Sequence, residues 1–113
     1  MPLLVKSHIL MSVPRLRTRL SDQAALDYDD ILLRSMLEFG DVQMVAYQVK
    51  LDRAFQRLTR FPGMGTLSAV RDDGTRQIPI GSHVMYFRRV NDEIWVLRLL
   101  HHRQQLRPGD FDF

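Results

Sequence analysis

The chain has 113 residues, with 16 Lys and Arg against 13 Asp and Glu, and it contains no cysteine. This length indicates one domain, and the lack of cysteine excludes a disulfide framework and any thiolate metal site. A net charge of +3 is by itself weak evidence for a nucleic-acid partner. Neither a glycine-rich phosphate loop nor a metal-ligand spacing is present, so we expect no cofactor and no metal.

The first segment, residues 1–12, is apolar in places but is interrupted by Lys6, Ser7 and His8. It is too short and too broken for a signal peptide or a membrane span. We therefore expect a cytoplasmic protein without a membrane partner. Its organisation would be an N-terminal tail at 1–12, one folded domain at 13–104 and a C-terminal tail at 105–113.

Residues 15–20 alternate strictly, which predicts a strand with Leu16, Thr18 and Leu20 on one side. The other side carries three arginines: Arg15, Arg17 and Arg19. Such a ridge is either a solvated edge that prevents aggregation or a docking site for an acidic partner.

Two helices are predicted next. Ser21 and Asp22 offer an N-cap for a helix over 22–39, which Gly40 ends, and Asp41 would cap a second helix over 42–60. Each helix has one apolar stripe at helical spacing and then a second one. The second stripes comprise Leu26, Leu33, Leu37, Val42, Val45 and Val49. They belong either to a wide core-facing surface or to an exposed groove that a partner covers.

After a loop at 66–75, three strands are predicted at 76–80, 83–90 and 94–101. Pro79 places the first of them at an edge or a bulge. If Val90 pairs with Glu93, Arg88 lies across from Trp95, where a cation–π contact could form. The order β-α-α-β-β-β predicts an α+β fold, with a helical hairpin packed on a small antiparallel sheet.

Cationic side chains gather late in the chain and suit an anionic target or an acidic partner. Arg98 stands in an otherwise apolar strand, so it must meet an internal carboxylate or face a groove that a partner's carboxylate fills. The candidate target-binding residues are Arg88, Arg98, His101, His102 and Arg103. His83, at a strand start, could simply satisfy a backbone carbonyl.

An ordered set of residues resembles the ParE branch of the RelE/ParE toxin superfamily. The set spans about 16–104, and its most specific pieces are Gly81-x-His83-Val84-x-Tyr86 and Leu100-His101-x-Arg103; the rest includes Asp27 to Ile31, Phe39-Gly40, Gln43, Tyr47, Leu51 and Pro62. Phe39 stands where the family usually has Trp. The resemblance implies the RelE/ParE fold and a toxin of a type II toxin–antitoxin module.

The resemblance also implies growth arrest through inhibition of DNA gyrase, a role in plasmid stabilization, and neutralisation by a ParD-like antitoxin. Homodimers and heterotetramers with the antitoxin are both compatible with it. The antitoxin would cover an apolar and basic surface whose candidate residues are Leu26, Leu33, Leu37, Val45, Val49, Arg15, Arg17 and Arg19.

Two alternatives remain open. In a RelE-like ribosome-dependent mRNA endoribonuclease, His83 and Arg103 would fall at basic functional positions, but the late tyrosine and the lysine pair of that branch have no counterpart. The other alternative is a binding module that has lost its toxicity.

Overall fold

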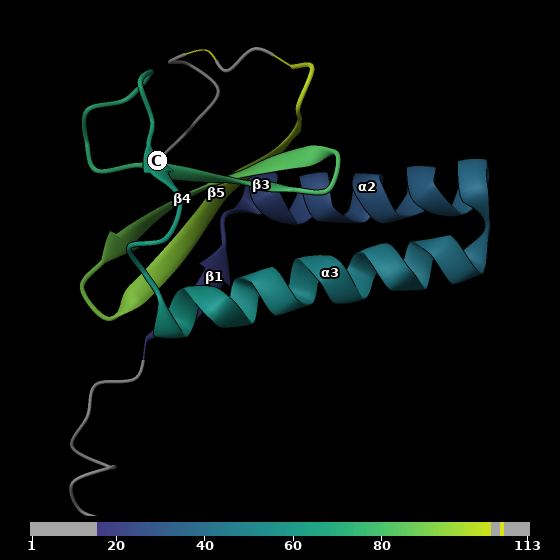
Figure 1. Cartoon of the computed structure of the whole chain (residues 1–113), viewed down its shortest axis with the longest axis horizontal. Helices are drawn as coiled ribbons and strands as arrows, with labels where there is room; N and C mark the ends of the chain where they lie inside the picture. Colours follow the sequence, from purple (N-terminus) through teal and green to yellow (C-terminus); the bar gives the residue numbers. More distant parts are fainter. Residues whose placement is uncertain (1–15, 105–106, 108–113) are drawn as a thin grey trace, which may run out of the picture.

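A computed structural model describes residues 16–104 and 107 (Figure 1). The order is β1 (Arg17–Leu20), α2 (Asp22–Phe39), α3 (Asp41–Arg60), β2 (Thr66–Leu67), β3 (Arg76–Ile80), β4 (His83–Val90) and β5 (Glu93–His101). The two predicted helices and the three late strands are confirmed to within a residue at each end. Of the early strand, the part from Arg17 onward is confirmed, and Arg15 lies outside the described residues.

The sheet has five strands in the order β1-β5-β4-β3-β2. β1 runs parallel to β5, while the other pairs are antiparallel. The expectation of an antiparallel sheet is therefore wrong at one edge. β1 leads into the helical hairpin, and the chain returns through three more strands before β5 lies beside it in the same direction. β2 was also missed, because its two residues occur inside a loop sequence.

The connections between the elements follow from short-range chemistry. The Ser21 hydroxyl caps α2 by accepting from the Ala24 N–H at 3.1 Å, and it donates to the Leu97 carbonyl of β5 at 2.8 Å. Gly40 joins the helices at a φ of +88°, a conformation that favours glycine. Asp41 does not cap α3 as predicted; it lies in the first helical turn, where its charge suits the helix dipole.

Both helices cover one face of the sheet. The core between the two layers is formed by residues such as Ala24, Ile31, Leu51, Leu58, Met85, Phe87, Ile94 and Val96. A second, smaller cluster on the other face joins Tyr86, Leu97 and Leu100 with Val84 and Trp95. A β-bulge between β4 and β5 near Tyr86 shifts the alternation of β5, so that Val96 and Leu99 both reach the main core.

The second apolar stripes lie outside this core. Leu37 is 73 % exposed and Val42 is 85 % exposed, and the other four members are also exposed. Towards Gly40 the hairpin extends beyond the edge of the sheet (Figure 1). The reading of these stripes as part of a wide core-facing surface is therefore wrong. Among the described residues, no helix combines the length and apolar character needed to cross a membrane.

Candidate binding groove

A groove of about 730 Å³ lies between the hairpin and the end of the sheet. α2 and the start of α3 form one wall, and the adjoining ends of β4 and β5 form the other. Most of the residues that line it are polar; they include Asp27, Glu38, Tyr47, His83, Arg98 and His101. A groove of this size and composition suits a segment of another polypeptide or a polar ligand.

An ion pair crosses this groove from helix to sheet. Asp27 of α2 accepts from Nε and Nη2 of Arg98 at 2.8 and 3.1 Å, and from the Leu99 N–H at 3.0 Å. Both side chains are largely shielded from solvent. The internal-carboxylate reading of Arg98 is therefore confirmed. Because Asp27 already occupies the guanidinium fork, Arg98 orients the groove wall rather than presenting a free charge.

A tyrosine that lines the same groove binds three groups. The Tyr47 hydroxyl lies 2.6 Å from Nδ1 of His83, 3.0 Å from the Ile80 carbonyl and 3.1 Å from the Ser82 N–H. A phenolic oxygen has one proton and two lone pairs. All three contacts are satisfied when Tyr47 donates to Ile80 and accepts from Ser82 and from Nδ1–H of His83. The hydrogen-bond network thus assigns the His83 proton to Nδ1 and leaves Nε2 as an acceptor.

Glycine is required beside this tyrosine. Gly81 has a φ of +57°, and a Cβ atom built on it would lie 2.8 Å from the hydroxyl and the ring of Tyr47. Both the backbone conformation and the close approach therefore exclude a side chain. This accounts for the first half of the Gly81-x-His83 motif, because the glycine lets the ring reach the histidine.

His83 is held neutral by its surroundings. Burial, together with the neighbouring His101 and His102 rings, lowers the pKa of His83 to about 4. The His101 ring packs edge-on at 5.4 Å from that of His83, and His102 follows at 4.4 Å from His101. Burial also raises the pKa of Tyr47, so its hydroxyl keeps its proton. The expected carbonyl partner of His83 is wrong; its partner is the Tyr47 hydroxyl.

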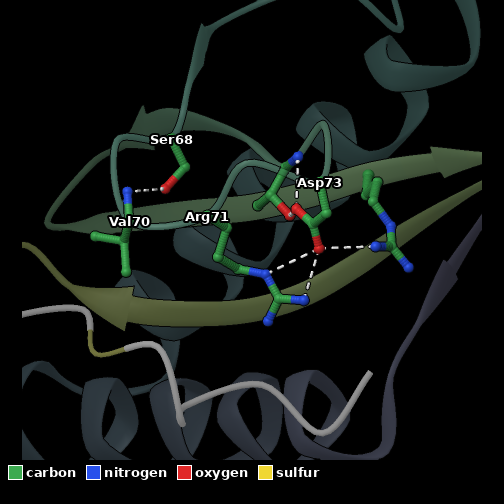
Figure 2. Close-up of polar contacts among 6 residues, drawn as sticks. Ser68, Val70, Arg71 and Asp73 are labelled. Carbon is green, nitrogen blue, oxygen red and sulfur yellow. Dashed lines mark hydrogen bonds and ion pairs between the residues drawn. The ribbon is translucent and has the colours of Figure 1, made fainter.

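A separate polar cluster lies in the loop after β2. Asp73 accepts from Nε and Nη2 of Arg71 at 3.0 and 2.6 Å and from Arg88 of β4 at 2.7 Å (Figure 2). Hydrogen bonds from Arg71, opposed by burial and assisted by the buried Thr75, hold the pKa of Asp73 well below its usual range. Arg88, a predicted target contact, therefore fastens this loop to the sheet.

The predicted pairing of β4 with β5 is confirmed, because Arg88 lies opposite Trp95 and Val90 opposite Glu93. The predicted row of arginines on β1, next to β5, has an internal partner at one described position. The guanidinium that lies over the Trp95 ring, at 5.7 Å, belongs to Arg19, which also forms an ion pair with Glu93 at 2.6 Å. Arg17 is exposed on the same edge strand.

The end of β5 brings together three of the predicted target-binding residues. His102 and Arg103 are exposed, and His101 is half-buried beside them. The His102 ring contacts the Ser82 carbonyl at 2.9 Å, which sets this turn against the start of β4. Arg103 has no ion-pair partner among residues 16–104, so this turn carries a free charge next to His101, which lines the groove.

The sequence patterns did not predict Tyr47, Asp27 and Asp73 as the partners that hold His83, Arg98 and Arg88 in place. Tyr47 and Asp27 did belong to the residues that carried the family resemblance, whereas no signal singled out Asp73. Within the described part of the chain, no cluster of three or more histidine and carboxylate groups could hold a metal ion.

Comparison with known proteins agrees with this fold. A sequence model described as ParE toxin of the type II toxin–antitoxin system, parDE, matches residues 18–106. The chain is 33 % identical over 89 residues to Toxin ParE1 of Caulobacter vibrioides, an alignment that covers 79 % of this chain and 92 % of that protein.

Two solved structures share the fold at low sequence identity. One is from a chromosomal ParDE toxin–antitoxin system of P. aeruginosa, with a TM-score of 0.66 and 18 % identity, covering 77 % of this chain and 96 % of that one. The other is from the RelBE2 toxin–antitoxin complex of Mycobacterium tuberculosis, with a TM-score of 0.54 and 20 % identity, covering 78 % and 99 %.

Proposed function

Because this chain belongs to the ParE toxin family of type II toxin–antitoxin systems, we propose that it inhibits DNA gyrase and that a ParD-like antitoxin neutralises it. The chain would inhibit gyrase by binding to it and not by catalysing a reaction. Because gyrase acts on DNA inside the cell, the proposal also places the protein in the cytoplasm. The observation that carries the antitoxin half of this proposal is the exposed apolar surface of the hairpin.

The apolar side chains of that surface lie outside the core that the helices and the sheet bury between them. Contiguous exposed apolar patches on a soluble domain mark interaction sites, since water around them is released when a partner docks. The stripes of α2 and α3 present residues at i, i+3, i+4 and i+7 spacings that suit an amphipathic segment. We therefore assign antitoxin binding to Leu26, Leu33, Leu37, Val42, Val45 and Val49. Arg17 and Arg19 would meet acidic residues of the same partner.

The antitoxin half is tested by affinity. The small open reading frame expected beside this gene supplies the partner, and isothermal titration calorimetry measures binding. Leu33→Asp with Leu37→Asp should weaken binding at least about 100-fold, because two apolar side chains lose their burial. Leu67→Asp, at a 66 % exposed leucine in β2, is the matched control and should bind normally. Equal losses in both variants would contradict the assignment.

Target contact is assigned to the end of β5 and the turn that follows it. Arg88 and Arg98 each have an internal carboxylate partner, which leaves His101, His102 and Arg103 as the accessible cationic and aromatic group. In a supercoiling assay, the purified chain should inhibit gyrase near stoichiometry. His102→Ala with Arg103→Ala should lose inhibition while keeping antitoxin affinity. Full gyrase activity in a stoichiometric excess of the chain would count against this target.

An endoribonuclease remains the second candidate because His83 is neutral in the groove, and a neutral imidazole can act as a base. Against it, the guanidinium of Arg98 in the same groove is already paired with Asp27. Primer extension on mRNA from expressing cells would reveal cuts within codons. Such cuts, abolished by His83→Ala and by Arg103→Ala, would replace the gyrase proposal. Normal growth without an antitoxin would instead indicate a chain that is no longer toxic.

A further inference from the structure

The second half of α3 carries a row of cations that the surfaces described above do not use. Arg53, Arg57 and Arg60 lie at i, i+4 and i+7 and are all exposed, so they share one side of the helix. Lys50 extends the row by one turn and lies over the Tyr47 ring at 5.7 Å. Arg53, Arg57 and Arg60 together form what we call the basic stripe.

The three arginines of the basic stripe have no ion-pair partner within residues 16–104, although arginines elsewhere do. Asp52 is the one carboxylate between Lys50 and Arg60, and it accepts a hydrogen bond from the Tyr28 hydroxyl at 2.8 Å. Arg57 and Arg60 lie in the last turn and suit the helix dipole, but Arg53 lies about two turns before the end, beyond its reach. Like charges at this spacing repel each other, so the row is unfavourable unless an anion meets it.

The charge is also segregated. α2 contains five carboxylates and one arginine, whereas Lys50 to Arg60 contains four cations and one carboxylate. A polyanion would therefore be repelled by α2 and attracted to the second half of α3.

We propose that the basic stripe binds the phosphodiester backbone of a nucleic acid. Seven residues of helix span roughly 10 Å, which matches about three phosphates at 3.4 Å per nucleotide of one strand. Arginine is suited to this role because its planar fork binds phosphate oxygens in pairs.

An acidic peptide is the competing ligand. Peptide docking on a helix depends on apolar anchors, but no large apolar side chain is exposed between Lys50 and Arg60, and the exposed valines of α3 end at Val49. Phosphate binding needs no such anchors, because counterion release supplies its free energy. Phe61, exposed directly after the basic stripe, adds an aromatic ring on which a base can stack.

The test measures the salt dependence of binding by fluorescence anisotropy with the purified full chain. The probes are a short DNA duplex of mixed sequence and the RNA duplex of the same sequence. Three neutralised phosphates predict a slope of log K against log salt of about −2.7 with DNA, and Arg53→Gln with Arg57→Gln should reduce it to about −0.9. Arg34→Gln with Arg89→Gln removes the same charge from exposed sites elsewhere and should leave the slope unchanged.

No binding at low salt would overturn the proposal, and so would equal losses in the two double variants. Displacement of the duplex by polyglutamate more readily than by unlabelled DNA at equal charge would also overturn it, in favour of an acidic polypeptide. The duplex that binds more tightly identifies the source of the phosphates. If the double variant fails to fold by circular dichroism, Arg53→Gln alone should lower the slope by about 0.9. Gyrase is absent from this assay, so its outcome is independent of the proposed target.

Discussion

The hydroxyl of Tyr47 in α3 lies 2.6 Å from Nδ1 of His83 at the start of β4. This contact joins the helical layer to the sheet in the lining of the groove, where the Ile80 carbonyl and the Ser82 N–H bind the same oxygen. The geometry depends on Gly81, whose missing Cβ leaves room for the ring.

Replacing Tyr47 with Phe should change the histidine tautomer. The wild-type network places the proton of His83 on Nδ1, and without the hydroxyl the ring should revert toward the Nε2–H form, which is usual in water. Long-range ¹H–¹⁵N NMR correlation of the imidazole reads this directly. Stability should fall by about 1–2 kcal/mol, because the Ile80 and Ser82 groups lose their partner. Tyr28→Phe, which removes a hydroxyl from the other helix, should leave the His83 spectrum unchanged. An Nε2–H tautomer in the wild type would refute the assignment.

Stability should depend on pH through His83. Its pKa of about 4 in the folded state lies below the ordinary value near 6.5, so the unfolded chain binds more protons between these values. The free energy of unfolding should therefore fall as pH drops from about 6.5 to 4, by on the order of 2 kcal/mol. Urea unfolding at a series of pH values measures it. His83→Gln should flatten the dependence in this window, and an unchanged slope would show that other groups cause it.

The Asp73 carboxylate should control a second, more acidic transition. Its pKa is lowered in the folded state, so its stabilisation is present above the ordinary carboxyl value near 4 and is lost as pH falls further. Asp73→Asn should cost about 2 kcal/mol at neutral pH, since Arg71 and Arg88 lose their shared acceptor. The variant should also lose less stability than the wild type below about pH 4, because only the contribution of Asp73 is removed. Asp72→Asn, at the exposed neighbouring residue, is the control and should behave as wild type.

Asp27 and Arg98 should be energetically coupled. Removing one partner leaves the other charge largely shielded from solvent and without this counter-ion, so Asp27→Asn and Arg98→Met should each destabilise the fold by about 2–3 kcal/mol. The double variant should lose less than the sum, with a coupling free energy of about 1–2 kcal/mol from urea unfolding. Additive losses would mean that the ion pair contributes little beyond its packing.

Without an antitoxin, the chain should associate with itself through the exposed apolar stripes. Light scattering should show species larger than a monomer at high concentration, and Leu33→Asp with Leu37→Asp should restore the monomer, since charged side chains resist burial. A monomer at high concentration in the wild type would contradict this expectation.

The local pattern of the chain determined much of this protein. The Ser21 cap, the glycine at 40 and the apolar periods defined both helices, and the alternation after Arg76 defined the three late strands and the Arg88–Trp95 register. These features depend on neighbours a few residues apart, so the sequence encodes them directly. The resemblance also identified the fold and the family.

Tertiary structure decided which cations are free and which direction the edge strand takes. Whether Arg98 meets Asp27, Arg88 meets Asp73 or Arg19 meets Glu93 depends on residues brought together from distant elements, and a guanidinium is satisfied by whichever carboxylate lies within reach. The parallel β1 edge has the same origin, because a strand's orientation is set by how the layers stack after the hairpin has turned back. The exposure of Leu37 and Val42 also depends on tertiary structure, because the helical hairpin is longer than the small sheet that it covers and extends past it.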